Sequence, residues 1–253
     1  MPTLRDSRVW FFAIVMMIPF LGAAPAATAA TQSSAIQLPG VTVKGDSASI
    51  SIIILLTILA MLPSILLSMT PFVRILVIFH FLRQALGTQT APTNQTLIGL
   101  SLFLTYFIMQ PVGAAVNQQA IVPFERGTIT SWQALEKGAV PVRLFMLGYT
   151  REKDLALFVE MSREPRPQKP EDLSMSIVIP AYIISELKTG FQIGAVLFLP
   201  FLVIDLVTAS VTTSIGMLQL PPVVISTPLK ILLFVVADGW NLVVGSTLKS
   251  FHY

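Results

Sequence analysis

Residues 177–218 read IVIPAYIISELKTGFQIGAVLFLPFLVIDLVTASVTTSIGML, and only Glu186, Lys188 and Asp205 carry a charge in this stretch. A helix that spans a bilayer needs roughly 20 predominantly apolar residues. The stretch is long enough to enter a membrane but too long for one straight crossing, and Glu186-Leu187-Lys188 interrupts it. We therefore expect two helices or a bent hairpin arm here.

Three further apolar segments lie at about 50–69, 97–116 and 222–244, each with the length of a spanning helix. Hydrophobic residues make up 54% of the 253 residues and charged residues 11%, whereas a soluble domain carries roughly a quarter charged residues. The sequence predicts an all-α membrane protein of kinked helical hairpins, with about four hydrophobic segments and one extracytoplasmic loop subdomain.

The first 30 residues are typical of a cleavable signal peptide. Arg5 and Arg8 precede a short apolar run at 9–21, and Ala27-Thr28-Ala29 offers a small-x-small cleavage site at Ala29. An uncleaved first membrane helix is the alternative. We divide the remainder into a flexible periplasmic N-terminus (31–49), a first hairpin (50–116), a periplasmic loop subdomain (117–176) and a second hairpin or hairpins (177–253).

Basic residues suggest the orientation. The link 70–96 carries Arg74, Arg83 and His80 and no acidic residue, which places it on the cytoplasmic side by the positive-inside rule. The long loop 117–176 balances eight acidic with eight basic residues, as in a solvated subdomain. Within it, Thr150 is expected to cap a helix that has Glu152 and Asp154 in its first turn.

Prolines are frequent in or beside the apolar segments. An interior proline removes a backbone hydrogen bond and disturbs the preceding turn, and in lipid the freed carbonyl needs another partner. We expect bent helices packed against protein. The prolines concerned are Pro63, Pro71, Pro111, Pro180, Pro200, Pro221, Pro222 and Pro228.

Charges within apolar sequence are the first candidates for a functional site, because an ionised group there is costly unless paired or hydrated. They are Glu186, Lys188, Asp205, Lys230 and Asp238. Glu186 and Lys188 are two residues apart and do not face each other on a helix, so each needs a partner on another segment or chain. Structural pairing, a water-filled path and a proton relay all remain open.

Two other features concern packing and closure. Gly190 and Gly194 have the small-xxx-small spacing that permits close helix approach. Met217-Leu218-Gln219 leads into Pro221-Pro222 and is either a flexible apolar loop that closes a pore or a plain turn.

Catalysis and cofactor binding have little support in the sequence. There is no cysteine, the two histidines are far apart, and metalloprotease, P-loop, dinucleotide and nucleophile-elbow motifs are absent. The charge is not gathered into a nucleic-acid footprint. We expect no enzyme activity and no cofactor. A small-solute transporter with Asp205 and Asp238 as ion ligands is the alternative function.

Several long motifs resemble the FliP family. They include LPSILLSMTPFVRI at 62–75, LRQALGTQ at 82–89, FLTYFIMQPV at 103–112, PAYIISELKTGFQIG at 180–194 and LFVVADGW at 233–240. The loop segments RLFM at 143–146 and TREKDL at 150–155 are similar to the family's periplasmic signature. The resemblance covers about 50–251.

The resemblance implies a core subunit of the flagellar type III protein export gate in the inner membrane, within the flagellar basal body. About five copies, with FliQ and FliR, would form a helical cone that passes unfolded flagellar subunits, and FlhA and FlhB are further implied partners. The injectisome homologue of this gate is an alternative. The family commonly has a methionine cluster, or gasket, that seals the closed pore. In this chain the cluster has fewer methionines, since Met217 is followed by Leu218 and Gln219.

Overall fold

The computed structural model describes residues 47–88, 90–162, 169, 172–216 and 221–251. These residues form helices joined by short links and contain no strand, so the predicted all-α fold is confirmed. The helices are α2 (Ser47–Ser68), α3 (Phe72–Ala85), α4 (Asn94–Val116), the π-helical η2 (Asn117–Ile121), α5 (Val122–Glu125), α6 (Ser131–Tyr149), α7 (Glu152–Met161), α8 (Met175–Ser214), α9 (Val223–Val236) and α10 (Gly239–Lys249).

The predicted signal peptide with Ala29, the segment 31–46, and the gasket candidates Met217, Leu218 and Gln219 lie outside the described residues. The chain divides into two compact units, Met1–Leu66 and Leu67–Tyr253. Helix α2 falls almost entirely in the first unit. It is apolar along its length, and its described large side chains are about half exposed.

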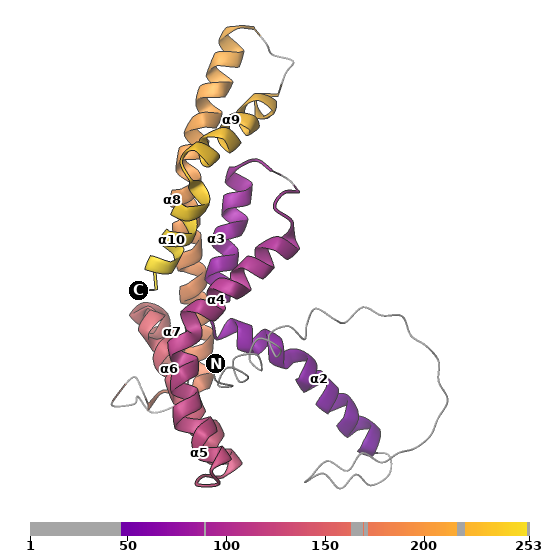
Figure 1. Cartoon of the computed structure of the whole chain (residues 1–253), viewed down its shortest axis with the longest axis vertical. Helices are drawn as coiled ribbons and strands as arrows, with labels where there is room; N and C mark the ends of the chain where they lie inside the picture. Colours follow the sequence, from indigo (N-terminus) through magenta and orange to yellow (C-terminus); the bar gives the residue numbers. More distant parts are fainter. Residues whose placement is uncertain (1–46, 89, 163–168, 170–171, 217–220, 252–253) are drawn as a thin grey trace, which may run out of the picture. The chain divides into compact units, whose positions relative to one another are not determined.

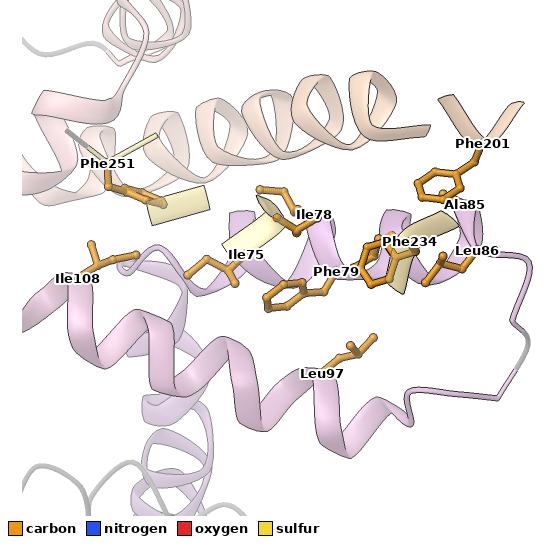
Figure 2. Packing of buried hydrophobic residues seen from close by; sticks show 12 residues of the cluster. Ile75, Ile78, Phe79, Ala85, Leu86, Leu97, Ile108, Phe201, Phe234 and Phe251 are labelled. Atoms are coloured by element: carbon orange, nitrogen blue, oxygen red, sulfur yellow. The ribbon is translucent and has the colours of Figure 1, made fainter. Parts of the chain in front are cut away.

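The core of the second unit is built on α3. Figure 1 shows α3 and α4 as a hairpin, with α3 running along α8, its most extensive neighbour. Side chains of α3 at helical spacing are almost completely buried, and residues from α4, α8, α9 and α10 pack against them (Figure 2). The members of this core from α3 and its last turn are Ile75, Ile78, Phe79, Leu82, Ala85 and Leu86.

Side-chain caps define two helix starts. Thr93 accepts a hydrogen bond from the backbone N–H of Thr96 at the start of α4. Thr130 and Gln133 form a reciprocal capping box at the start of α6. The threonine at each cap has a low helix propensity but is favoured at the N-cap, where its hydroxyl accepts from a free backbone N–H.

One prediction about the apolar segments is wrong. Helix α8 is one continuous helix of 40 residues that contains Pro180 and Pro200, where we expected two helices or a bent arm. At 1.5 Å per residue it is about 60 Å long, twice the roughly 30 Å hydrocarbon thickness of a bilayer. The segment 222–244 bends by 67° between α9 and α10, in agreement with the predicted kinked helices.

The bend between α9 and α10 lies at Asp238 and is not caused by a proline. Its backbone is left-handed (φ 51°, ψ 48°), a conformation that aspartate tolerates better than most residues. Asn241 Nδ2 donates a hydrogen bond to Asp238 Oδ2 over 3.1 Å and stabilises the turn. A Cβ at the next residue, Gly239, would collide with the ring of Phe234, so the tight turn needs glycine there.

Two helical stretches among the described residues are long and apolar enough to cross a membrane, Asn94–Glu125 and Met175–Ser214. Up to four crossings are possible if the helix pair 52–68 with 72–85 and the pair 223–236 with 239–249 each count as one. The predicted membrane character is therefore confirmed.

Candidate functional site: three ion pairs on the longest helix

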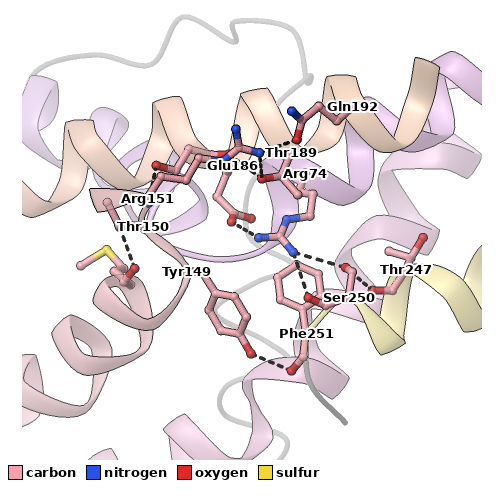
Figure 3. Close-up of polar contacts among 12 residues, drawn as sticks. Arg74, Tyr149, Thr150, Arg151, Glu186, Thr189, Gln192, Thr247, Ser250 and Phe251 are labelled. Atoms are coloured by element: carbon pink, nitrogen blue, oxygen red, sulfur yellow. Dashed lines mark hydrogen bonds and ion pairs between the residues drawn. The ribbon is translucent and has the colours of Figure 1, made fainter. Parts of the chain in front are cut away.

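Arg74 and Glu186 form a buried ion pair that joins α3 to α8. Their side chains are 3% and 0% exposed. Arg74 also donates hydrogen bonds to the backbone oxygen and the hydroxyl of Ser250, each over 3.3 Å. Figure 3 shows the guanidinium reaching Glu186 on one side and Ser250 on the other. The sequence placed Arg74 at the membrane boundary, whereas the structure places it inside the protein.

Aromatic rings cover this pair. The Arg74 guanidinium carbon lies 4.0 Å from the centre of the Phe251 ring and 5.5 Å from that of Tyr149, which is within cation–π range. The Tyr149 hydroxyl donates to the Phe251 backbone oxygen over 2.6 Å. Residues 250–251 therefore cover Arg74 of α3, whose counter-charge Glu186 comes from α8.

The pair is not fully satisfied by hydrogen bonds. No bond of ordinary geometry reaches Glu186 Oε2, Arg74 Nε or the Tyr182 hydroxyl, all of which are buried. Burying a charge pair is costly, and removing one partner leaves the other uncompensated, at about 3–5 kcal/mol. The pair therefore fastens α3 to α8, and loss of either partner would leave an unpaired buried charge.

A second pair joins α7 to α8. Lys188 Nζ contacts the carboxylate of Asp154, which also accepts a hydrogen bond from the Ser185 hydroxyl over 2.9 Å. The Asp154 side chain is 4% exposed and that of Lys188 is 51% exposed. The hydrogen bond from Lys188 lowers the pKa of Asp154, against the opposing effect of burial. The carboxylate therefore stays ionised at physiological pH.

The link between α6 and α7 is held against the same part of α8. The backbone N–H of Arg151 donates to Ser185 Oγ over 3.0 Å, and its guanidinium donates to Thr189 Oγ1 and Gln192 Oε1 over 3.1 and 2.5 Å (Figure 3). The predicted cap is wrong in one respect. Arg151 is the N-cap of α7, while Thr150 ends α6 and donates its hydroxyl to Met146 O.

The third pair joins α8 to α9. Lys230 Nζ lies 2.5 Å from Asp205 Oδ2, and the side chains are 5% and 34% exposed. Asp205 has no basic neighbour in sequence, and its partner is 25 residues away. Asp205 and Asp238 have different partners, since Lys230 contacts the first carboxylate and Asn241 donates to the second.

The two glycines lie where α8 meets α3. A Cβ at Gly190 would come within 3.1 Å of Val77 Cγ1, and one at Gly194 within 2.6 Å of Phe81 Cγ. Arg83, in contrast, is partly exposed and contacts Asn94 Oδ1 over 2.6 Å. The backbones of α3 and α8 therefore approach closely, and ion pairs join α8 to α3, α7 and α9.

Sequence reasoning missed the partners of these charges. Asp154 was noted only as an acid in a first helical turn, and Tyr149, Ser250 and Phe251 were not noted. The available signal was the need of every buried charge for a counter-charge. In the described part of the chain no three histidine or carboxylate side chains come together as metal ligands. The arrangement connects helices mechanically.

Comparison with known proteins agrees with the motifs. The family model described as the FliP family matches residues 55–247. The flagellar biosynthetic protein FliP of Pectobacterium carotovorum subsp. carotovorum is 50% identical over 223 residues, 85% of this chain and 86% of that protein. That of Bacillus subtilis (strain 168) is 48% identical over 205 residues, 81% and 93% of the two chains. This chain belongs to the FliP family of flagellar biosynthetic proteins.

Proposed function

We propose that this protein is a channel-forming subunit of the flagellar type III export gate, and that it passes unfolded flagellar subunits across the inner membrane. Family membership over most of the chain carries this proposal. A conduit subunit acts by holding helices in place, and the three ion pairs serve that purpose without a catalytic group.

The dimensions of the helices support an assembled state. Helix α8 alone is about twice as long as a bilayer's hydrocarbon layer is thick. Large apolar side chains from Phe191 to Ile215 are exposed along much of it, yet Asp205 lies among them. Lipid alone does not suit a surface that is both over-long and interrupted by charge. We propose that further copies of this chain, with FliQ and FliR, cover it, and that FlhA and FlhB complete the apparatus.

The first experiment tests the function itself. Deletion of the gene is expected to abolish secretion of hook and filament protein while leaving their synthesis intact, because the conduit is missing. The measurement is the amount of these proteins in culture supernatant and in cells, with the plasmid-borne gene as the control. Normal secretion in the deletion strain would overturn the proposal.

The second experiment concerns closure. We propose that Met217, Leu218 and Gln219 form the seal of the resting pore, since flexible apolar side chains fill irregular gaps. Replacing Met217 and Leu218 by alanine is expected to raise resting ion conductance several-fold above the wild-type level, because two long side chains are lost. Conductance is measured by electrical recording of the assembled complex, and Ile215→Ala nearby is the control. Conductance equal to that of the control contradicts the seal.

The orientation follows as part of the same proposal. Residues 117–176, including α6 and α7, are placed in the periplasm, and the link 70–96 faces the cytoplasm. The mature chain begins after a cleaved signal peptide. No enzyme activity is assigned to the protein.

A further inference from the structure

An open pocket of about 450 Å³ lies at the end of α3, where the chain turns toward α4. It is lined by His80, Arg83, Gln84, Gly87 and Thr88. All four side chains that line it end in nitrogen or oxygen. The pocket is thus lined by polar side chains.

Arg83 gives the pocket a positive charge that no acid balances. Its partners are Asn94 Oδ1 over 2.6 Å, the Pro92 backbone oxygen over 3.5 Å and His80 Nδ1 over 3.1 Å, all neutral acceptors. The chain carries no acidic residue between Asp46 and Glu125. The two acidic residues of α8, Glu186 and Asp205, are already paired with Arg74 and Lys230.

The same contacts leave donors available. Nη1 of Arg83 makes two of these contacts and Nη2 makes one. In these contacts no described residue accepts a hydrogen bond from Nε or from the second hydrogen of Nη2. Because Arg83 donates to His80 Nδ1, the neutral His80 ring carries its proton on Nε2, which is therefore a donor. A guanidinium and an imidazole N–H side by side suit an oxyanion, and a phosphate best.

The location indicates where such a phosphate comes from. The pocket lies at the turn of a hairpin whose two helices, α3 and α4, are both apolar (Figure 1). A turn leaves backbone groups without helical partners, which favours the membrane interface over the hydrocarbon for an open pocket such as this one. Lipid phosphates lie at that depth, and basic pockets between membrane helices bind anionic head groups.

We propose that the pocket at His80 and Arg83 binds the phosphate of an anionic membrane lipid. Gly87 and Thr88 line the same pocket and complete the site around the head group. This site is separate from the three ion pairs and is not needed for the proposed transport function.

The test uses the full-length protein, purified in detergent with its co-purifying subunits and stripped of lipid. Phosphatidylglycerol is titrated and bound lipid is counted by native mass spectrometry. Arg83→Gln is expected to weaken binding by about fivefold, the effect of roughly 1 kcal/mol for one basic residue near a membrane surface. Arg126→Gln is the matched control, since Arg126 is an exposed arginine outside the pocket, and its binding is expected to stay within about twofold of wild type.

Two variants separate binding from a merely structural role. Asn94→Ala removes the shortest brace of Arg83 but keeps the charge, so binding is expected to persist. His80→Leu removes the second donor and is expected to weaken binding by a few fold. If Arg83→Gln fails to accumulate, His80→Leu decides the question, and unchanged binding in that variant overturns the proposal.

The source of the phosphate is tested in the same titration. Millimolar inorganic phosphate is expected to leave phosphatidylglycerol bound, because the lipid also gains apolar contact. Displacement of the lipid by free phosphate, or equal binding by the Arg83→Gln and wild-type proteins, contradicts a lipid site. Motility of the variants is a separate measurement, so a failure here does not bear on export.

Discussion

Replacing Glu186 by lysine is expected to remove most of the protein from the membrane fraction. The substitution leaves Arg74 without its partner and places a second positive charge beside it, in a site where both side chains are almost completely buried. Breaking a buried pair costs about 3–5 kcal/mol, a large part of the 5–15 kcal/mol that stabilises a typical protein. Immunoblots of membrane fractions and swimming assays give the measurement.

The matched control is Glu136→Lys, the same change at an exposed position of α6, which is expected to be tolerated. Exchanging the two charges, with Arg74→Glu and Glu186→Arg together, is expected to restore part of the lost protein, because a pair exists again. A Glu186→Lys protein that accumulates and assembles normally but does not secrete would falsify the fastening role. It would instead indicate that Glu186 faces the transport path.

Replacing Gly194 by leucine is expected to separate α8 from α3. A Cβ there would lie 2.6 Å from Phe81 Cγ and 2.9 Å from Phe81 Cβ. These atoms are at the root of the Phe81 side chain and cannot move aside without the backbone. Overpacking costs typically 1–3 kcal/mol and occasionally more, and leucine's better helix propensity offsets less than about 1 kcal/mol. The midpoint of heat-induced aggregation in detergent is expected to fall by several degrees.

Gly99→Leu on α4 is the control, because a Cβ at Gly99 meets nothing within 4 Å in this chain. It gains the same helix propensity without the collision, so its aggregation midpoint is expected to stay at or above that of wild type. A Gly194→Leu protein as stable as the Gly99→Leu protein would show that α3 and α8 are not held in close contact.

Much of the fold could be predicted from the sequence, and α8 shows where prediction failed. Two prolines and the tripeptide Glu186-Leu187-Lys188 suggested a break. The helix continues through this tripeptide because both charges are paired. Glu186 pairs with Arg74 of α3 and Lys188 with Asp154 of α7. The position of the bend in the last apolar segment was not predicted, because Asp238 looks like a buried charge and not like a left-handed turn residue.

The candidate site could be predicted only in part. Four of the five charges that stood out in apolar sequence belong to the three ion pairs. Their partners could not be assigned, because Arg74 and Glu186 are 112 residues apart and Ser250 lies 176 residues beyond Arg74. Helical periodicity reports which face of one helix is apolar and says nothing about which helix faces it.

The cover over Arg74 has a consequence for biosynthesis. Ribosomes deliver α3 early and α8 much later, and residues 250–251 arrive after both. During synthesis Arg74 therefore lacks its counter-charge until α8 has been made, and it lacks the contacts of residues 250–251 for longer. The guanidinium thus gains its counter-charge before its cover, because Glu186 precedes residues 250–251 along the chain.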